Sequence, residues 1–240
     1  MHIPDGYLGP LTFVPLFIIM IPIWLYAGNK VRNELKSRQV PLLALAAAFA
    51  FVIMMFNVPI PDGSSGHAVG GVIIAIVLGP WAAVISVSTA LLIQCLMFGD
   101  GGVTAFGANC FNMAVVIPFV GYYAYKFISG HSDILSNRRV LAAVVAGWLG
   151  LSVAAGVAGF EMGIQPTLEH NAAGQPLYMP YGLNATVPAM LFGHMFFFSI
   201  VEAIVTGLIF VYVQRTDPSM FYNSKAIPKA AAKDTVTAAG

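Results

Sequence analysis

Charged side chains are scarce in this sequence: they make up 9% of its 240 residues, whereas 58% are hydrophobic. Soluble domains usually carry about 25% charged residues. A chain of this length cannot hide so much apolar surface in one core, so lipid must solvate much of it. The apolar runs are continuous and do not alternate with polar residues, as they would in a transmembrane β-barrel. The sequence therefore predicts an all-α, multi-pass membrane protein.

Several functional signatures are also missing. The net charge of +1 offers no basic surface for nucleic acid. The sequence contains no GxxxxGK[ST] nucleotide-binding loop and no HExxH motif, so we expect neither ATP hydrolysis by this chain nor an intramembrane metal hydrolase. Cys95 and Cys110 lie in apolar stretches without a CxxC spacing, which favours packing residues over a disulfide or a metal pair.

Seven apolar segments follow one another along the chain. They cover approximately residues 8–28, 40–56, 68–78, 81–98, 105–128, 140–160 and 187–213. We therefore expect a transmembrane bundle of seven helices over residues 1–218, beginning with the helix at 8–28. A long polar loop is expected from Glu161 to Asn184, and a loosely ordered tail over residues 219–240.

The basic residues predict how the bundle is oriented. All eleven lie in the loops after the first and fifth segments, at the end of the fifth segment, or in the tail: Lys30, Arg32, Lys36, Arg38, Lys126, Arg138, Arg139, Arg215, Lys225, Lys229 and Lys233. The opposite side carries acidic residues only: Asp5, Asp62, Asp100, Glu161 and Glu169. The positive-inside rule then predicts a protein of the cytoplasmic membrane with its N-terminus outside and its C-terminus in the cytoplasm.

The third segment, residues 68–78, is too short to cross the membrane. Its helix would rise about 16 Å, whereas the hydrocarbon core is about 30 Å thick. The stretch before it, NVPIPDGSSGH, is rich in proline and glycine and must be non-helical. Broken segments of this type mark binding sites in transporters, so we expect the loop to enter the protein from outside with His67 at its deep end.

Five histidines are present, and their surroundings differ. His131 and His170 lie in polar loops and are interpreted as solvated. His194 lies eight residues before Glu202 on one face of the last segment, where a functional role and a packing contact are both open. His2 and His67 lie on the outer side, each in a loop that contains Pro-Asp-Gly.

Met1 and His2 together offer three nitrogen ligands in one plane. The α-amine and the His2 amide nitrogen close a five-membered ring on a metal, and the amide and Nδ1 of His2 close a six-membered one. The His67 imidazole then fits the fourth position. We expect no cleavable signal peptide, so that Met1 keeps its amine outside. Planar nitrogen sites suit Ni(II) or Cu(II), not Zn(II), Mg(II) or Ca(II). The alternative is that His2 is a chance surface residue.

Three stretches carry a resemblance to a known family. MHIPDGYL, GSSGH and GDGGVTAFGANCFNM resemble the CbiM/NikM family, the substrate-binding membrane components of energy-coupling-factor cobalt and nickel importers. The resemblance spans the chain and implies seven transmembrane helices, of which the N-terminal one is added to a six-helix core. It also implies Met1, His2 and His67 as ligands of Ni(II) or Co(II), which is the substrate, with no catalytic cofactor.

The resemblance further implies partners. These are a transmembrane coupling subunit, two ATP-binding cassette subunits and often a small accessory membrane protein. Overlapping small-residue pairs, Ala44 with Ala48 and Ala46 with Ala50, are candidate contacts with the coupling subunit, although helix packing within the chain is the alternative.

Polar residues near the histidines are candidate hydrogen-bond partners of the ligands: Ser64, Ser65, Asn109 and Asn112. For Ser65 the alternative is helix capping, and for Asn109 it is an interhelical hydrogen bond.

These observations favour a substrate-capture subunit for nickel or cobalt uptake. The Met1 amine and the His2 amide must lose protons to bind, so affinity should fall at acid pH; the unperturbed pKa of an α-amine is about 7.7–8.0. We favour nickel, because an amide nitrogen in a plane suits low-spin d⁸ nickel. The alternative is a self-sufficient secondary transporter or channel. Charged residues in several helices would favour it, but only Glu202 is clearly so placed.

Overall fold

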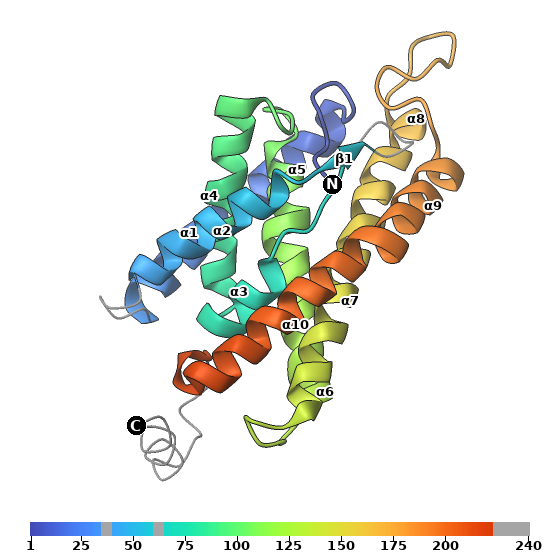
Figure 1. The fold of residues 1–240 in the computed structure, drawn as a ribbon. Coiled ribbons are helices and arrows are strands. Elements are labelled where there is room, and N and C mark those ends of the chain that lie inside the picture. The colour runs from blue at the N-terminus through green and yellow to red at the C-terminus, as the bar shows by residue number, and fades with distance from the viewer. Residues whose placement is uncertain (35–39, 60–64, 223–240) are drawn as a thin grey trace, which may run out of the picture.

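The computed structural model describes residues 1–34, 40–59 and 65–222, and it is a bundle of helices (Figure 1). The first half contains α1 (Pro10–Glu34), α2 (Val40–Met54), α3 (Gly71–Leu78) and α4 (Pro80–Ile93), which continues into the π-helical turn η2 (Gln94–Phe98). Next comes one continuous helical stretch made of α5 (Phe106–Cys110), the π-helical η3 (Phe111–Val116) and α6 (Ile117–Ser129).

The second half consists of two long helical stretches and a short end. The stretches are α7 (Asn137–Gly163), followed by α8 (Gln165–Leu168), and α9 (Leu183–Gly193), which continues through the π-helical η4 (His194–Phe198) into α10 (Ser199–Thr216). The 3-10 helix η5 (Pro218–Met220) ends the described chain. Met1 lies near one end of the bundle and η5 lies at the other (Figure 1).

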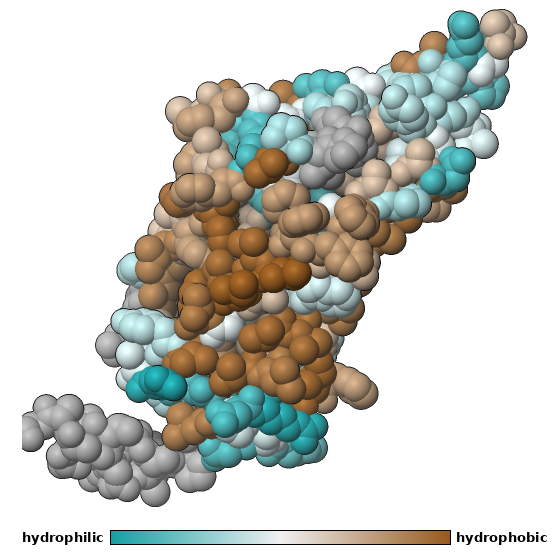
Figure 2. Space-filling model, turned by 45° about the vertical axis from the view of Figure 1, so that its right-hand side comes forward, coloured by the Kyte–Doolittle hydropathy of each residue, from teal (hydrophilic) through white to brown (hydrophobic). Residues whose placement is uncertain are grey.

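Five helical stretches of the described chain are long and apolar enough to cross a membrane: Pro10–Glu34, Pro80–Phe98, Phe106–Ser129, Asn137–Leu168 and Leu183–Thr216. The helix α2 is apolar but shorter. Figure 2 shows hydrophobic residues over the middle of one face and hydrophilic residues gathered toward both ends. The chain is therefore a multi-pass helical membrane protein, as the composition predicts.

The short helix α3 lies inside the bundle, and all but one of its residues are buried. It has eight residues, so it rises about 12 Å and spans only part of the membrane thickness. Gly70 precedes it with φ 73°, and Gly79 ends it with φ 95°. The Glu202 carboxylate of α10 accepts hydrogen bonds from the amides of Val69 and Gly70, each at 2.8 Å, and so holds the backbone that leads into its N-terminus.

Small residues let α7 approach its neighbours closely. A Cβ added at Gly150 would lie 2.8 Å from the Ile117 carbonyl oxygen, and one added at Gly159 would lie 3.0 Å from the Val187 Cα. The other main contacts of α7 are with α10. Membrane helices associate through such close packing, since lipid offers no hydrophobic driving force between them.

The helices largely follow the seven predicted segments, but several boundaries differ. Lys30 and Arg32 lie within α1, and Arg138 and Arg139 lie within α7, so these basic residues are in helix ends and not in the predicted loops. The predicted outer loop begins too early, because Glu161 lies within α7 and is 6% exposed. Packed chain also extends past the expected boundary at residue 219, since Phe221 is buried and the Tyr222 amide donates to the Ile76 carbonyl oxygen. The sequence pattern gave no sign of a two-stranded antiparallel hairpin, β1 (Val58–Pro59) with β2 (Ser65–Gly66).

Candidate metal centre

The N-terminal arm, defined as residues 1–9, runs into the protein instead of into solvent. Met1, His2 and Ile3 are all buried. The Asn109 side chain of α5 holds Ile3 from both sides: its Oδ1 accepts from the Ile3 amide at 2.8 Å, and its Nδ2 donates to the Ile3 carbonyl at 3.0 Å. The Gly102 amide also donates to the Ile3 carbonyl oxygen, at 2.9 Å. These bonds fix the backbone directly after His2.

Asp5 ties the turn of the arm to the loop before α5. Its carboxylate accepts hydrogen bonds from the amides of Val103 and Thr104 and from the Thr104 hydroxyl. The Thr104 hydroxyl bond is the main reason that the pKa of Asp5 lies below its usual value. Gly6 follows with φ 83°, a backbone conformation that glycine adopts at low cost. The Pro-Asp-Gly motif therefore acts as the predicted turn.

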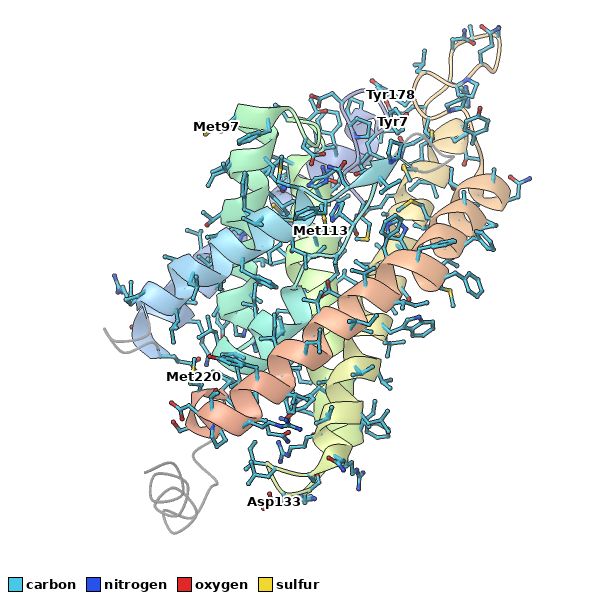
Figure 3. The ribbon with its side chains drawn as sticks, in the orientation of Figure 1. Tyr7, Met97, Met113, Asp133, Tyr178 and Met220 are labelled. Atoms are coloured by element: carbon cyan, nitrogen blue, oxygen red, sulfur yellow. The ribbon has the colours of Figure 1, made fainter. Side chains whose placement is uncertain are left out.

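The far end of the arm is held by α7, α8 and the loop that follows. The Gly9 amide donates to the Gln165 Oε1 at 2.9 Å, and the Leu11 amide donates to the Glu169 Oε1 at 2.9 Å. The Met179 amide donates to the Tyr7 carbonyl oxygen at 3.2 Å. Figure 3 shows Tyr7 beside the loop residue Tyr178 at this end of the bundle. The arm is thus anchored at three places, and Met1 and His2 project from it into the interior.

His2 meets His67 in the interior. Their ring centroids are 4.6 Å apart, and the ring planes are inclined by 34°. His2 is 4% exposed and His67 is fully buried. His67 comes directly after β2, and Gly66 before it lies against the Phe198 ring of η4, so closely that a Cβ at Gly66 would overlap the ring.

The hydrogen bonds of the two rings determine which nitrogen is available. The His2 Nε2 lies 3.2 Å from the Gln94 Oε1, and the His67 Nδ1 lies 3.0 Å from the Ala68 carbonyl oxygen. Carbonyl oxygens only accept, so both nitrogens carry the proton. The opposite nitrogens, His2 Nδ1 and His67 Nε2, are therefore unprotonated in the neutral rings. Both are buried, and neither makes a hydrogen bond to the described residues, although the Asp100 Oδ1 lies 3.3 Å from the His2 Nδ1.

Electrostatics agree with a neutral His2. Its pKa is lowered to about 3, first by burial and second by the nearby Met1 ammonium. The same ammonium acts electrostatically on His67. The Met1 ammonium therefore acts electrostatically on both imidazoles. Neutral imidazole and neutral amine are the forms that bind metal ions.

Side chains alone do not complete a metal site here. Across residues 1–34, 40–59 and 65–222, no three His, Cys, Asp or Glu side chains form a group that fits a metal. Two imidazole nitrogens are too few for a tight site. The Met1 amine and the His2 amide nitrogen supply the remaining donors by sequence position. We call these two atoms, together with His2 Nδ1 and His67 Nε2, the four-nitrogen site.

The residues that the sequence predicts as hydrogen-bond partners of the ligand histidines do not bond to them in the structure, and other residues do. Asn109 binds the Ile3 backbone, and the Asn112 Nδ2 donates instead to the buried Glu161 carboxylate at 2.7 Å. The Ser65 hydroxyl is buried and has no partner among the described residues, and Ser64 lies outside them. Gln94 and Ala68 hold the rings instead.

The other residues that the sequence singles out differ in their exposure. Ala46 and Ala50 are buried inside the chain, whereas Ala44 and Ala48 are exposed on α2. His131 and His170 are exposed, and Cys95 and Cys110 are buried, unpaired thiols.

The polar pair on the last helical stretch is buried. The His194 Nδ1 donates to the Met190 carbonyl at 2.8 Å, at the start of η4. Glu202 makes the packing contact before α3 described above.

Comparison with known proteins gives consistent matches. The family model described as CbiM, cobalt uptake substrate-specific transmembrane region, matches residues 2–220. The fused nickel transport protein NikMN of Rhodobacter capsulatus is 49% identical over 226 residues, which are 94% of this chain and 65% of that protein. The putative metal transport protein MJ1569 of Methanocaldococcus jannaschii is 47% identical over 222 residues, 92% of this chain and 95% of that protein. A solved transition metal transporter superposes over both full chains with a TM-score of 0.87 and 44% identity.

Proposed function

Because this chain belongs to the CbiM family, we propose that it is the substrate-capture component of a nickel or cobalt uptake system and binds the ion at the four-nitrogen site. One observation carries the proposal: His2 Nδ1 and His67 Nε2 are both buried and make no hydrogen bond to the described residues, and the two rings lie side by side. An unpartnered buried nitrogen normally costs about 1–3 kcal/mol, so two together need a ligand to account for them.

Capture follows from the states of the donor atoms. The two imidazoles are neutral and held by Gln94 and Ala68, so they bind without losing protons. The Met1 ammonium and the His2 amide each lose a proton as the ion binds, and the water of the incoming ion is displaced. Four nitrogens in one plane favour Ni(II) over ions that prefer oxygen ligands or a tetrahedron.

The direction of metal-ion transport and its energy source are also part of the proposal. We place Met1 and the four-nitrogen site on the outer side, because the basic residues of the described chain lie near the ends of α1, α6 and α10 and at the start of α7, at the opposite end of the bundle (Figure 1). In this arrangement the seven segments cross or enter the membrane, and α3 is the partial one. Inward release is driven by separate subunits: a coupling subunit, ATP-binding cassette subunits and a small accessory membrane protein.

The nickel-loaded protein provides the central test. Purified full-length chain should bind one Ni(II) per molecule and show the absorption and diamagnetism of square-planar nickel. An octahedral, paramagnetic spectrum would contradict the four-nitrogen site. Uptake of nickel by cells that express this chain without any ATPase subunit would instead favour a self-sufficient transporter.

A further inference from the structure

The acidic residue Asp100 lies at the mouth of the four-nitrogen site. It sits between Gly99, with φ 65°, and Gly101, with φ 87°. Its amide donates to the Gln94 carbonyl oxygen at 3.1 Å, so this tight turn is fixed to the first residue of η2. A Cβ at Gly101 would lie 3.2 Å from the His2 Cδ2, which shows how closely the turn packs on the His2 ring.

The Asp100 carboxylate faces the nitrogen of His2 that is available for metal. Its Oδ1 lies 3.3 Å from the His2 Nδ1, and its Oδ2 accepts a hydrogen bond from the Asn57 Nδ2 at 3.0 Å. The side chain of Asp100 is 20% exposed, whereas that of His2 is 3% exposed. One side chain therefore touches both the outside and a ligand of the site.

The contact between these two atoms is unfavourable by itself, and without a metal ion the Met1 ammonium is the cation that acts on the carboxylate. The His2 Nδ1 carries a lone pair, because the proton is on the nitrogen that faces Gln94. A carboxylate oxygen at 3.3 Å presents a second lone pair to it. A metal ion on Nδ1 converts this repulsion into attraction.

The net charge of the site with a metal ion bound also points to Asp100. A divalent ion brings two positive charges, and the deprotonated His2 amide removes one. The Met1 amine and the two imidazoles are neutral when they bind. One positive charge is then left in a buried place, where an unpaired charge is strongly disfavoured. Among the acidic side chains that the structure describes, Asp100 is the one in contact with a histidine of the site.

We propose that Asp100 is the counter-charge of the four-nitrogen site and the residue that first receives the hydrated divalent cation from outside. This inference rests on the proposed function. Asp100 adds charge without entering the nitrogen plane, and the sum of charges reaches zero for a divalent ion. The hydrogen bond from Asn57 keeps the carboxylate aimed at His2 when no ion is present.

The experiment compares nickel binding by the purified full-length wild-type protein, Asp100→Asn and Asp100→Glu. Asp133→Asn is the control, since Asp133 is exposed at the opposite end of the bundle (Figure 3). Asp100→Asn should keep the square-planar spectrum but lose about tenfold to hundredfold in affinity, the range for a lost interaction with a charged group. Its association rate should fall and depend less on salt. Asp100→Glu should recover most of the affinity, and Asp133→Asn should behave as wild type.

Two results would overturn the inference. The first is an Asp100→Asn protein with wild-type affinity and association rate. The second is an equal loss in Asp100→Asn and Asp100→Glu, which would mean that the shape of the turn matters and its charge does not. Failure of the wild-type protein to bind nickel would instead defeat the proposed function itself, so the two failures are distinguishable.

Discussion

The imidazoles of His2 and His67 lie with their centroids 4.6 Å apart, although 64 residues separate them in the chain. The N-terminal arm brings one ring, and the loop between α2 and α3 brings the other. Each ring uses one nitrogen for a protein hydrogen bond and leaves the other bare toward the interior. The predictions below depend on this pair and on what holds it in place.

Removing either ring should abolish tight nickel binding. We expect His2→Ala and His67→Ala each to weaken affinity by more than about a hundredfold, since even hydrogen-bond partners of metal ligands are worth about 10- to 100-fold. The exposed His131→Ala and His170→Ala serve as matched controls and should bind as wild type. Isothermal titration calorimetry on purified protein measures all four. Full binding by His2→Ala would remove the basis of the four-nitrogen site.

Moving the amine away from His2 should break the chelate. One glycine added before Met1 leaves every side chain in place, but it converts the Met1 nitrogen into a peptide nitrogen. We expect loss of the square-planar spectrum and a drop in affinity comparable with that of His2→Ala. A glycine added after Gly240 is the control. Normal binding by the N-terminally extended protein would mean that the amine is not a ligand.

Nickel affinity should fall as the solution becomes more acidic. The pKa of His2 is already lowered to about 3 by burial and the Met1 ammonium, so this ring stays neutral across the physiological range and contributes no change there. The protons released come from the amine and the amide. Affinity should therefore fall by about tenfold per pH unit for each proton released on binding. Titrations from pH 6 to pH 9 in buffers of different ionisation enthalpy count these protons, and a flat profile would contradict the chelate.

Gln94 should matter because it sets the tautomer of His2. In Gln94→Leu, the His2 Nε2 loses its acceptor, so the ring is free to place the proton on Nδ1 instead. We expect affinity to fall about 10- to 100-fold, with the planar spectrum regained at high nickel concentration. Gln175→Leu, in an exposed loop, is the matched control. Equal affinity in the two variants would show that the Gln94 contact does not orient the ring.

We expect Gly66 to position His67, because only a residue without a side chain lets the backbone there pack against the Phe198 ring. A Cβ there would overlap the Phe198 ring, so Gly66→Ala must displace either the loop or η4. We expect weaker nickel binding in Gly66→Ala and partial recovery in the double variant Gly66→Ala, Phe198→Ala. A double-mutant cycle on the dissociation constants measures this coupling. Additive losses would mean that the two residues act independently.

Much of the fold is predictable from hydrophobicity alone. The continuous apolar runs predict the helices within a few residues, because lipid requires every backbone polar group to be bonded within the segment. Glu161 was misplaced because a single carboxylate near a helix end looks like the start of a loop. Its hydrogen bond to Asn112, 49 residues away, lets it stay inside α7, and no local pattern reveals that partner.

The candidate ligands were also predictable, but their supports were not. Unusual loops rich in glycine and proline single out His2 and His67, and chelate geometry follows from bond lengths within one dipeptide. Gln94 is an inconspicuous amide in an apolar helix, and the carbonyl of Ala68 has no sequence signature at all. Asn109 and Asn112 are near in sequence, yet one binds the arm and the other binds α7.

The sequence by itself determined that this is a helical membrane protein, and it predicts nitrogen donors at the first two residues and at a broken third segment. Those properties depend on local chemistry: side-chain hydrophobicity, helix length and the reach of neighbouring atoms. Only the tertiary structure decided which nitrogen of each ring lacks a hydrogen bond, that Gln94 and Asp100 face different nitrogens of the His2 ring, and that Glu202 binds the backbone before α3. These contacts join residues that are far apart in the chain, and they depend on how the helices pack together.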